Sequence, residues 1–494
     1  MTTIATKYDV IIGLEVHAQL LTQSKMFCRC NADYADSPPN SHVCPVCLGL
    51  PGSLPVANRR AVEYTIMTGL ALNCRIPEHG KFDRKNYPYP DLMKGYQISQ
   101  YDQPLCKDGW LLIEGEDGSE RRIGVTRVHL EEDTARLLHR DDPTGEGYSL
   151  VDVNRSGVPL MEIVSEPDIR SPEEARRYLV KLRQILRYLG VSAGNMEEGN
   201  FRVDANISVR PAGQEAYGVK VEVKNMNSFR SVARALEYEA RRQVELLESG
   251  GRVVQETRGW VEAQGRTVSQ RSKEYAHDYR YFPDPDLPPL VTSREWVEEV
   301  RSRLPELPDA KRRRFTEQYG LSAYEADLLT ETRARADYFE AALAGAGEGE
   351  AQRRRAKAAA NWILGDFAHL LSEAGLEIEQ SRIPPGHLAA MLDLIDRGAI
   401  STKIGKTVLE EMFHTGKTPQ QIVEEKGLAQ ISGADELAAV VDEVLAANEK
   451  AVADYRSGKA EALKFLVGQV MKATRGRANP QLVNDLLAQK LGAP

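Results

Sequence analysis

Acidic and histidine side chains recur at alternate positions in several short stretches of this 494-residue chain. In the segment IGLEVHAQL, Glu15 and His17 fall on one face of a predicted strand and apolar residues fall on the other. Alternate positions on a strand are about 7 Å apart, so both side chains can reach one cation or one metal-bound phosphate. The alternative interpretation of this pattern alone is a strand with a solvated polar face.

Two further stretches supply acids in a similar setting. The segment TRVHLEED places four polar side chains on a common face: Arg127, His129, Glu131 and Asp133. Glu162 lies in the otherwise apolar run PLMEIV, where a carboxylate is costly unless it is paired or bound to a metal. Carboxylates close to lysine and arginine suit Mg²⁺ and phosphate groups, so these strands predict a metal-dependent phosphate site.

A predicted hairpin adds a third polar face. Residues 201–210 alternate between apolar and polar types, and after a turn residues 219–224 do the same. Its polar face carries Asp204, Asn206, Ser208 and Lys224, among others. Several such sheets, each polar on one side, indicate a concave polar surface, here called the cradle.

Basic and aromatic residues alternate with prolines in the segment from Lys81 to Tyr96, which predicts a loop and not a helix. Its function is either to grip phosphates and stack on a base or only to pack on the surface. Residues 269–283 have a similar composition and favour a second binding wall.

Four of the six cysteines form a C-x-C followed by a C-x-x-C. A loop over residues 31–43, rich in turn formers, separates the two pairs. This spacing predicts a tetrahedral zinc site, here called the zinc clip, with ligands Cys28, Cys30, Cys44 and Cys47. Four thiolates leave no open coordination position, so we expect a structural role; reduced cysteines in a turn are the alternative.

Composition is that of a globular protein, with 42% hydrophobic residues, 28% charged residues and a net charge of −8. No stretch approaches the roughly 18 consecutive apolar residues of a membrane helix, and no signal peptide is evident. We therefore expect a cytoplasmic protein without a membrane segment. P-loop and G-x-S-x-G motifs are absent, and there is no G-x-G-x-x-G between a strand and a helix.

Helical periodicity begins at a capped helix after Ser171, and it dominates the chain beyond a proline-rich stretch at 283–289. We predict an α+β fold in which a largely antiparallel sheet with helices is followed by all-α domains. The expected domains are a catalytic cradle (1–292), a helical domain (293–405) and a helical tail (406–494). Residues 451–494 hold seven basic and three acidic residues, so a basic loop at 471–480 either binds a phosphate backbone or is a solvated charge run.

Taken together, these motifs resemble the GatB family, one of the component chains of tRNA-dependent amidotransferases. The likeness extends from about residue 8 to the end and rests on long segments: GLEVHAQL, KNYPYPDLMKGYQISQ, VHLEED, DVNRSGVPLMEIVSEPDI, RVDANISVRP, VKNMNSF, AHDYRYFPDPDLPP and FLVGQVMKATRGRANP. Pro88 and Met93 depart from the family pattern, in which an aromatic residue and a proline are usual.

The resemblance implies a function. A GatB protein uses ATP and Mg²⁺ to phosphorylate the side-chain carboxylate of misacylated Glu-tRNA(Gln), Asp-tRNA(Asn) or both. Ammonia from a partner amidase, the GatA protein, then displaces the phosphate, and a small third protein, GatC, completes the heterotrimer. The cradle would resemble the glutamine synthetase and guanido kinase fold, and the tail would hold the tRNA.

The resemblance also implies roles for individual residues. The Mg²⁺ ligands and catalytic residues would be Glu15, His17, Glu131 and Glu162. ATP or the acyl group would be bound by Lys81, Arg84, Lys85, Asn86, Tyr89, Arg155, Asp204, Asn206, Ser208 and Lys224. The tRNA would be contacted by Lys472, Arg475 and Arg477. Two other functions stay open: a tRNA-binding scaffold whose acids are structural, and a ligase acting on free glutamate.

Overall fold

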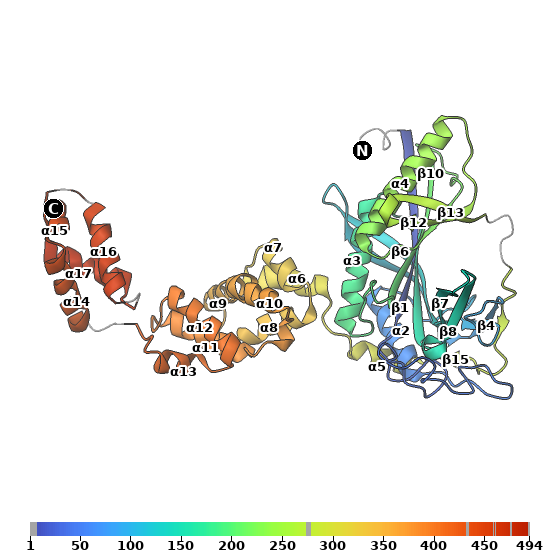
Figure 1. Ribbon diagram of the computed structural model, residues 1–494, viewed down its shortest axis with the longest axis horizontal. Helices are drawn as coiled ribbons and strands as arrows, with labels where there is room; N and C mark the ends of the chain where they lie inside the picture. The colour runs from blue at the N-terminus through green and yellow to red at the C-terminus, as the bar shows by residue number, and fades with distance from the viewer. Residues whose placement is uncertain are drawn as a thin grey trace. The chain divides into compact units, whose positions relative to one another are not determined.

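The computed structural model describes residues 7–272, 278–430, 434–457, 459, 461–474 and 477–492 (Figure 1). The chain divides into two compact units, Met1–Leu307 and Pro308–Pro494. Across the described ranges, no helix is both long and apolar enough to cross a bilayer.

An eight-stranded sheet, counted over the described residues, forms the centre of the N-terminal unit. In spatial order its strands are β13 (Arg266–Ser272), β12 (Glu256–Val261), β11 (Val221–Lys224), β10 (Phe201–Pro211), β1 (Tyr8–Gln19), β9 (Pro159–Ser165), β6 (Glu120–Glu132) and β5 (Cys106–Glu114). All neighbours are antiparallel except β11 and β12. The predicted antiparallel cradle of an α+β fold is thus confirmed.

The first strand shows why the two faces of the sheet differ. Ile12, Leu14 and Val16 in β1 are almost completely buried, whereas Glu15 and His17, at the alternate positions, lie on the opposite face. β10 alternates in the same way and pairs with β11, which confirms the predicted hairpin. One face is therefore apolar and the other carries the polar residues.

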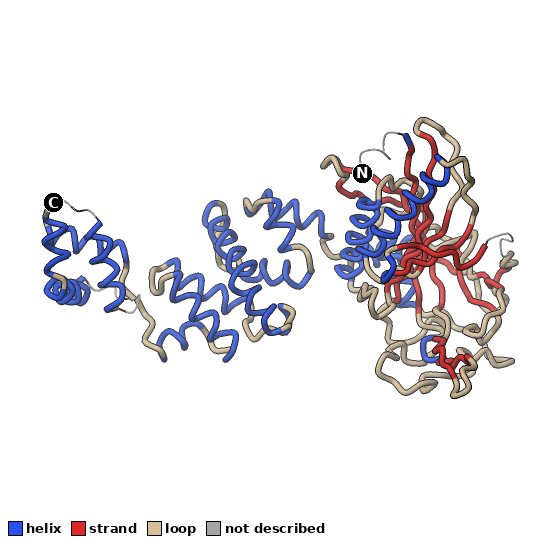
Figure 2. Tube along the Cα trace, turned by 45° about the horizontal axis from the view of Figure 1, so that its top comes forward, coloured by secondary structure: helices blue, strands red, loops and turns tan. Residues whose placement is uncertain are grey.

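Helices cover the apolar face (Figure 2). They are α2 (Arg59–Ala71), α3 (Pro172–Leu189) and α4 (Phe229–Glu248), with α5 (Arg294–Ser302) packed on α2. Ser171 caps α3 by accepting a hydrogen bond from the Glu174 amide, and Gly190 ends it in the left-handed conformation at φ 67°. Leu179, Leu182 and Val232 from these helices join the same core as Val16.

Smaller sheets lie beside the main one. They pair β14 (Phe282–Pro283) with β3 (Asp83–Asn86) and β4 (Tyr96–Ser99), β15 (Leu290–Val291) with β2 (His79–Gly80), and β7 (Arg136–Asp141) with β8 (Gly147–Asp152). The prediction of a loop throughout Lys81–Tyr96 is wrong for β3 and for the start of β4. Its strand character depends on pairing with β14, which is distant in sequence and invisible to a local pattern.

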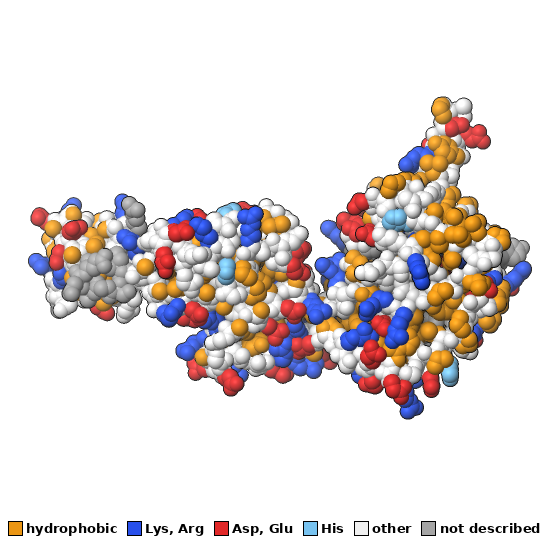
Figure 3. Space-filling view, turned by 90° about the horizontal axis from the view of Figure 1, so that it is seen from below, with side chains coloured by type: hydrophobic (Ala, Val, Ile, Leu, Met, Phe, Trp, Pro, Cys, Tyr) orange, Lys and Arg blue, Asp and Glu red, His pale blue; other side chains and the backbone are white. Residues whose placement is uncertain are grey.

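The second unit is helical throughout its described residues. Its helices are α6 (Pro308–Tyr319), α7 (Ala323–Leu329), α8 (Arg333–Ala342), α9 (Glu350–Trp362), α10 (Ala368–Ala374), α11 (Pro385–Asp396), α12 (Thr402–Thr415), α13 (Pro419–Glu425), α14 (Ala434–Ala447), α15 (Glu449–Arg456), α16 (Glu461–Ala473) and α17 (Pro480–Leu491). In the view of Figure 3, acidic and basic side chains are interspersed over this unit.

Two hydrophobic clusters lie within the helical unit. One runs from Phe315 to Val423 and the other from Leu437 to Leu491. Position 405 lies inside α12, and the first of these clusters continues beyond it. The domain boundaries predicted at 292 and 405 stay predictions.

Candidate active site

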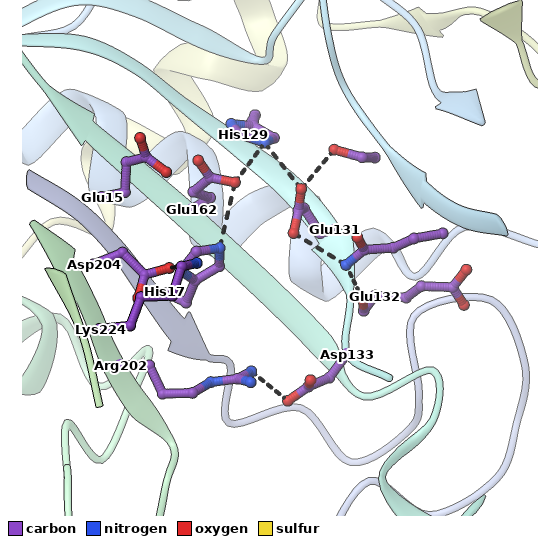
Figure 4. Close-up of polar contacts among 12 residues, drawn as sticks. Glu15, His17, His129, Glu131, Glu132, Asp133, Glu162, Arg202, Asp204 and Lys224 are labelled. Atoms are coloured by element: carbon purple, nitrogen blue, oxygen red, sulfur yellow. Dashed lines mark hydrogen bonds and ion pairs between the residues drawn. The ribbon is translucent and has the colours of Figure 1, made fainter. Parts of the chain in front are cut away.

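Three strands bring two histidines and a glutamate together on the polar face (Figure 4). Glu162 in β9 lies directly opposite His17 of β1 on one side and His129 of β6 on the other. Its Oε2 is 3.4 Å from Nε2 of His17 and 3.3 Å from Nε2 of His129. Cross-strand register, and not sequence spacing, therefore creates this contact.

Glu131 completes the cluster from the same strand as His129. Its Oε1 lies 3.4 Å from Nε2 of His129 and accepts a hydrogen bond of 2.7 Å from Ser99. Gln97 donates to its Oε2 at 3.1 Å. Ser99 and Gln97 belong to β4, which packs over the end of β6. Neither was predicted as a site residue, because only the tertiary contact of β4 with β6 reveals them.

His17, Glu131 and Glu162 can each direct one ligand atom at a common point, with these atoms within 4.8 Å of one another. Two carboxylates and one imidazole fit a divalent cation, and Mg²⁺ would complete its shell with water and phosphate oxygens. The structure thus brings together three of the four predicted Mg²⁺ ligands. We refer to these three residues as the acidic cluster.

Electrostatics in this cluster are strongly coupled. Burial opposes the charge on His129, yet the nearby carboxylates Glu162 and Glu131 raise its pKa to about 9. Burial likewise disfavours ionised Glu162, but the two histidines hold its pKa well below the usual range. These residues therefore form a largely buried group whose charges stabilise one another, the kind of setting in which perturbed pKa values accompany function.

Glu15, the fourth predicted ligand, lies two residues before His17 and faces β10. Its Oε1 accepts a hydrogen bond of 2.9 Å from Asn206, and Asp204 is its cross-strand neighbour. Burial and the charges of Glu162 and Asp204 raise the pKa of Glu15. Lys224 donates to Asp204 at 2.7 Å, so the predicted residues Asp204, Asn206 and Lys224 form a row of polar side chains beside Glu15.

Asp133 anchors the other end of the polar face. Its Oδ2 accepts hydrogen bonds of 2.7 Å from Arg202 and from Gln19. The predicted residue Arg155 lies 3.7 Å from its Oδ1 and donates to the carbonyls of Thr134 and Ala135 at 2.9 Å. Burial opposes ionisation, but the two arginines hold the pKa of Asp133 below its usual range.

Lys85 in β3 is the cross-strand neighbour of Gln97, the residue that donates to Glu131. Its Nζ lies 5.0 Å from the ring centre of Tyr279. Burial disfavours its charge, yet Glu131 and Glu162 raise its pKa. A cation near two carboxylates is well placed to meet a phosphate that approaches them.

The other predicted residues of this segment have structural partners. Lys81 pairs with Asp83 at 2.5 Å and with Asp102 at 2.6 Å. Arg84 pairs with Asp284 at 2.8 Å and with Asp286 at 2.9 Å.

Asn86 donates to the carbonyls of Tyr279 and Arg280, whereas Tyr89 is 58% exposed. Ser208 is buried in β10 opposite Ile11, away from the acidic cluster. Residues 273–277 of the second predicted binding wall lie outside the described residues.

The zinc clip has the geometry that its spacing predicted. The four sulfur atoms lie within 4.8 Å of one another, and those of Cys44 and Cys47 are 3.8 Å apart. Four thiolates at about 2.3 Å from a tetrahedral Zn²⁺ have nearly this separation. A hydrogen bond from Cys28 lowers the pKa of Cys47 to about 5, and burial raises the pKa of Cys30 to about 11. Four thiolates at this distance need a cation, so the donor set fits zinc.

The loop inside the zinc clip is tied to the turn that carries Arg155. Asn40 donates to the Val151 carbonyl at 3.1 Å and accepts from the Val153 amide at 2.8 Å. Asn154 donates to the Pro38 carbonyl at 2.7 Å. Hydrogen bonds therefore connect the zinc-clip loop to the segment that carries Arg155.

The predicted tRNA-binding residues lie at the end of the second unit. Lys472 is in the last turn of α16, so the prediction that it belongs to a loop is wrong; the helix continues to Ala473. Arg477 donates to the carbonyl of Gly427 at 3.3 Å. Arg475 lies outside the described residues.

Comparison with known proteins agrees with this architecture. The family model described as the GatB/GatE catalytic domain matches residues 10–298, and the one described as the GatB domain matches residues 337–491. The B subunit of the aspartyl/glutamyl-tRNA(Asn/Gln) amidotransferase of Carboxydothermus hydrogenoformans is 59% identical over 485 residues, which cover 98% of this chain and 99% of that relative. The protein of the same name from Thermomicrobium roseum is 59% identical over 490 residues, 99% of each chain. The chain therefore belongs to the GatB family.

Proposed function

We propose that this chain is the ATP-dependent component of a tRNA amidotransferase. It would phosphorylate the side-chain carboxylate of Glu-tRNA(Gln), Asp-tRNA(Asn) or both, and then pass the activated acyl group to ammonia. The observation that carries the proposal is the acidic cluster His17, Glu131 and Glu162, next to β3, where Lys85 is the cross-strand neighbour of Gln97. The names of the relatives supply the substrate class.

The reaction has two steps. A carboxylate oxygen of the acyl group attacks the γ-phosphorus of ATP, and ADP leaves. Ammonia then attacks the acyl carbon, and inorganic phosphate leaves. Phosphoryl transfer needs positioning and charge neutralisation more than covalent help from the protein. Mg²⁺ held by the cluster would neutralise the charge that develops on the transferred phosphoryl group.

The residues of the chain have separate tasks in this scheme. His17, Glu131 and Glu162 would hold the metal, and Ser99 and Gln97 orient Glu131 through their hydrogen bonds. Lys85 would meet the γ-phosphate. Asp133 with its arginine partners holds the strand ends in place. Zn²⁺ in the zinc clip would be structural.

The proposal also requires partners. The GatA amidase would supply ammonia and the small GatC protein would complete the complex, which would act in the cytoplasm. Charges of both signs alternate on the helical unit, so tRNA would be held by local contacts such as Lys472, Arg475 and Arg477.

The test uses the purified heterotrimer with misacylated tRNA, ATP, Mg²⁺ and ammonium. We expect Glu131→Gln to lower both γ-phosphate transfer and amide formation by about 10²-fold or more, because the metal loses a charged ligand. Glu120→Gln is the matched control, since Glu120 is an exposed glutamate at the start of the same strand. Thermal unfolding of both variants shows whether the fold is kept.

Each outcome separates the alternatives. Full activity of a folded Glu131→Gln variant would refute the metal site. Wild-type complex that binds tRNA but never transfers phosphate would favour a scaffold protein. Amide formation on free glutamate, without tRNA, would favour a small-molecule ligase.

A further inference from the structure

Lys25 is a completely buried lysine next to the zinc clip, with 0% of its surface exposed. Its Nζ donates to the carbonyls of His42 at 2.8 Å and Val153 at 3.4 Å. Both acceptors are neutral, and among the described residues Lys25 forms no ion pair with a carboxylate. A lysine is almost never fully buried without a partner of opposite charge, so the charge of Lys25 needs a compensating group.

Lys311 shows the usual arrangement of a buried lysine. It is the other lysine that is buried within the described ranges, and its Nζ lies 2.6 Å from a carboxylate oxygen of Asp337 and 2.9 Å from one of Glu340. Lys25 has two backbone carbonyls in place of these two acids. Carbonyls satisfy its hydrogen bonds but carry no net charge, so the negative charge must come from another group nearby.

The zinc clip lies directly beside the Lys25 side chain. A Cβ atom at Gly157 would be 3.4 Å from Cδ of Lys25 and 3.7 Å from Cβ of Cys47, so both side chains run past the same point. The Lys25 amide donates to the Cys30 carbonyl at 2.9 Å. A hydrogen bond from Cys28 is the main cause of the lowered pKa of Cys47, and the charge of Lys25 lowers it further. The ammonium charge therefore acts on the sulfur atoms.

Charge balance favours a pairing of Lys25 with the occupied metal site. Four thiolates carry four negative charges and Zn²⁺ carries two positive charges, which leaves an excess of two negative charges on the site. Cys47 is buried and the other three cysteines are half-buried, so water solvates this excess only in part. A nearby fixed cation then interacts with it strongly, and groups around the ligands of a metal tune its affinity.

We propose that Lys25 is the counter-cation of the zinc clip: its buried ammonium compensates half of the excess negative charge of the four-thiolate zinc site and raises the affinity for Zn²⁺. The assignment rests on zinc binding at the clip and does not depend on the phosphoryl-transfer reaction. The two carbonyl partners of Lys25 belong to the zinc-clip loop and to the segment that carries Arg155, so the same ammonium also joins these two parts of the chain.

Three substitutions in the full chain separate charge from hydrogen bonding and packing. Lys25→Arg keeps both the charge and the N–H donors, Lys25→Gln keeps N–H donors without the charge, and Lys25→Met keeps only an apolar stem. Lys311→Met is the matched control, because it removes the charge of a buried lysine in the helical unit. Competition with a chelator of known affinity measures Zn²⁺ binding, and thermal unfolding of the zinc-loaded protein shows whether each variant is folded.

The charge of Lys25 is expected to decide the result. Lys25→Gln and Lys25→Met should weaken Zn²⁺ binding by about tenfold or more, and Lys25→Arg by less than about threefold. Lys311→Met should leave the Zn²⁺ affinity unchanged even where it lowers the melting temperature. If Lys25→Met does not fold, the comparison of Lys25→Arg with Lys25→Gln decides, since both keep hydrogen-bond donors and differ in charge.

Co²⁺ in place of Zn²⁺ supplies a spectroscopic readout that a purely structural role of Lys25 would not change. A cation beside the thiolates lowers the energy of the sulfur electrons. Its loss in Lys25→Gln should therefore shift the thiolate-to-cobalt charge-transfer band to longer wavelength, and Lys25→Arg should keep the band in place.

The outcomes that would overturn the assignment are specific. Wild-type Zn²⁺ affinity and an unshifted cobalt band in Lys25→Gln would show that the charge has no role. Equal losses of affinity in Lys25→Arg and Lys25→Gln would assign Lys25 to packing alone. A wild-type chain that binds no zinc would refute both the zinc clip and this assignment, and it would leave the proposed phosphoryl transfer standing.

Discussion

Replacing Asp133 with asparagine is expected to destabilise the N-terminal unit although the two side chains have the same shape. Asp133 is buried, with 2% of its side chain exposed. Both of its oxygens accept hydrogen bonds, from Arg202 and Gln19 on one side and from the Thr134 amide on the other. An asparagine must turn its NH₂ group toward one of these sets of donors, whichever way it is oriented.

The cost follows from these contacts. If the NH₂ group faces Arg202 and Gln19, two hydrogen bonds to a charged carboxylate are lost, at about 1.5–3 kcal/mol each or about 3–6 kcal/mol together. If it faces the other way, the bond from the Thr134 amide is lost and the charge opposite the two arginines is missing. Arg202 has 39% of its side chain exposed, and water will recover part of this loss. We therefore expect a decrease of about 2–4 kcal/mol in the free energy of unfolding, a large fraction of the stability of a typical domain.

Urea unfolding of the isolated chain, followed by far-UV circular dichroism, measures this decrease. Asp141→Asn is the matched control, because Asp141 is an exposed aspartate at the end of β7, and it should change stability by less than about 0.5 kcal/mol. A double-mutant cycle with Arg202→Met should show coupling of about 1 kcal/mol or more. A loss below about 0.5 kcal/mol for Asp133→Asn, or no coupling, would refute the reasoning.

Three further outcomes are expected. Cys44→Ser should lower the melting temperature and remove about one zinc per chain, with activity falling only as the protein unfolds; a zinc-free wild type would contradict this. Lys85→Met should lower the rate of phosphoryl transfer by about 10²-fold at an unchanged melting temperature, and a loss below about threefold would exclude a role at the γ-phosphate. Burial opposes the charge of Glu340, but hydrogen bonds from Arg314 and Lys311 lower its pKa in the folded state. The ionised carboxylate therefore stabilises the fold fully above pH 4.5, and this contribution is lost as the pH falls through the lowered pKa of the folded state. Glu340→Gln should therefore reduce the melting temperature at neutral pH but not in strong acid, and an equal reduction at both would refute the ion-pair origin.

Local patterns predicted the elements of the fold well. Alternation in β1 and β10 predicted which side chains face the core, and Ser171 and Gly190 predicted the ends of α3. The proximity of the four cysteine sulfur atoms could also be predicted, because all four lie within one short segment. These features depend on neighbours in sequence, and so a single sequence contains them.

The contacts between polar side chains of different strands were harder to predict from the sequence. Glu162 contacts His17 and His129 only because β9 lies between β1 and β6, and strand order is a property of the whole chain. The aspartates that pair with Arg84 lie about 200 residues away, so its structural partners could not be anticipated.

The central position of β1 also shapes the way the protein is made. In the chain β1 precedes both of its neighbours in the sheet, β9 and β10, and β10 ends only at Pro211. At about 5–20 residues per second, synthesis takes roughly 10–40 s to supply both partners. During that interval β1 lacks at least one of its two strand partners, so the core around Ile12, Leu14 and Val16 is incomplete. Nascent chains that end before Pro211 should therefore be substrates for holdase chaperones and proteases, and the unit gains protection only after the β10 strand is complete.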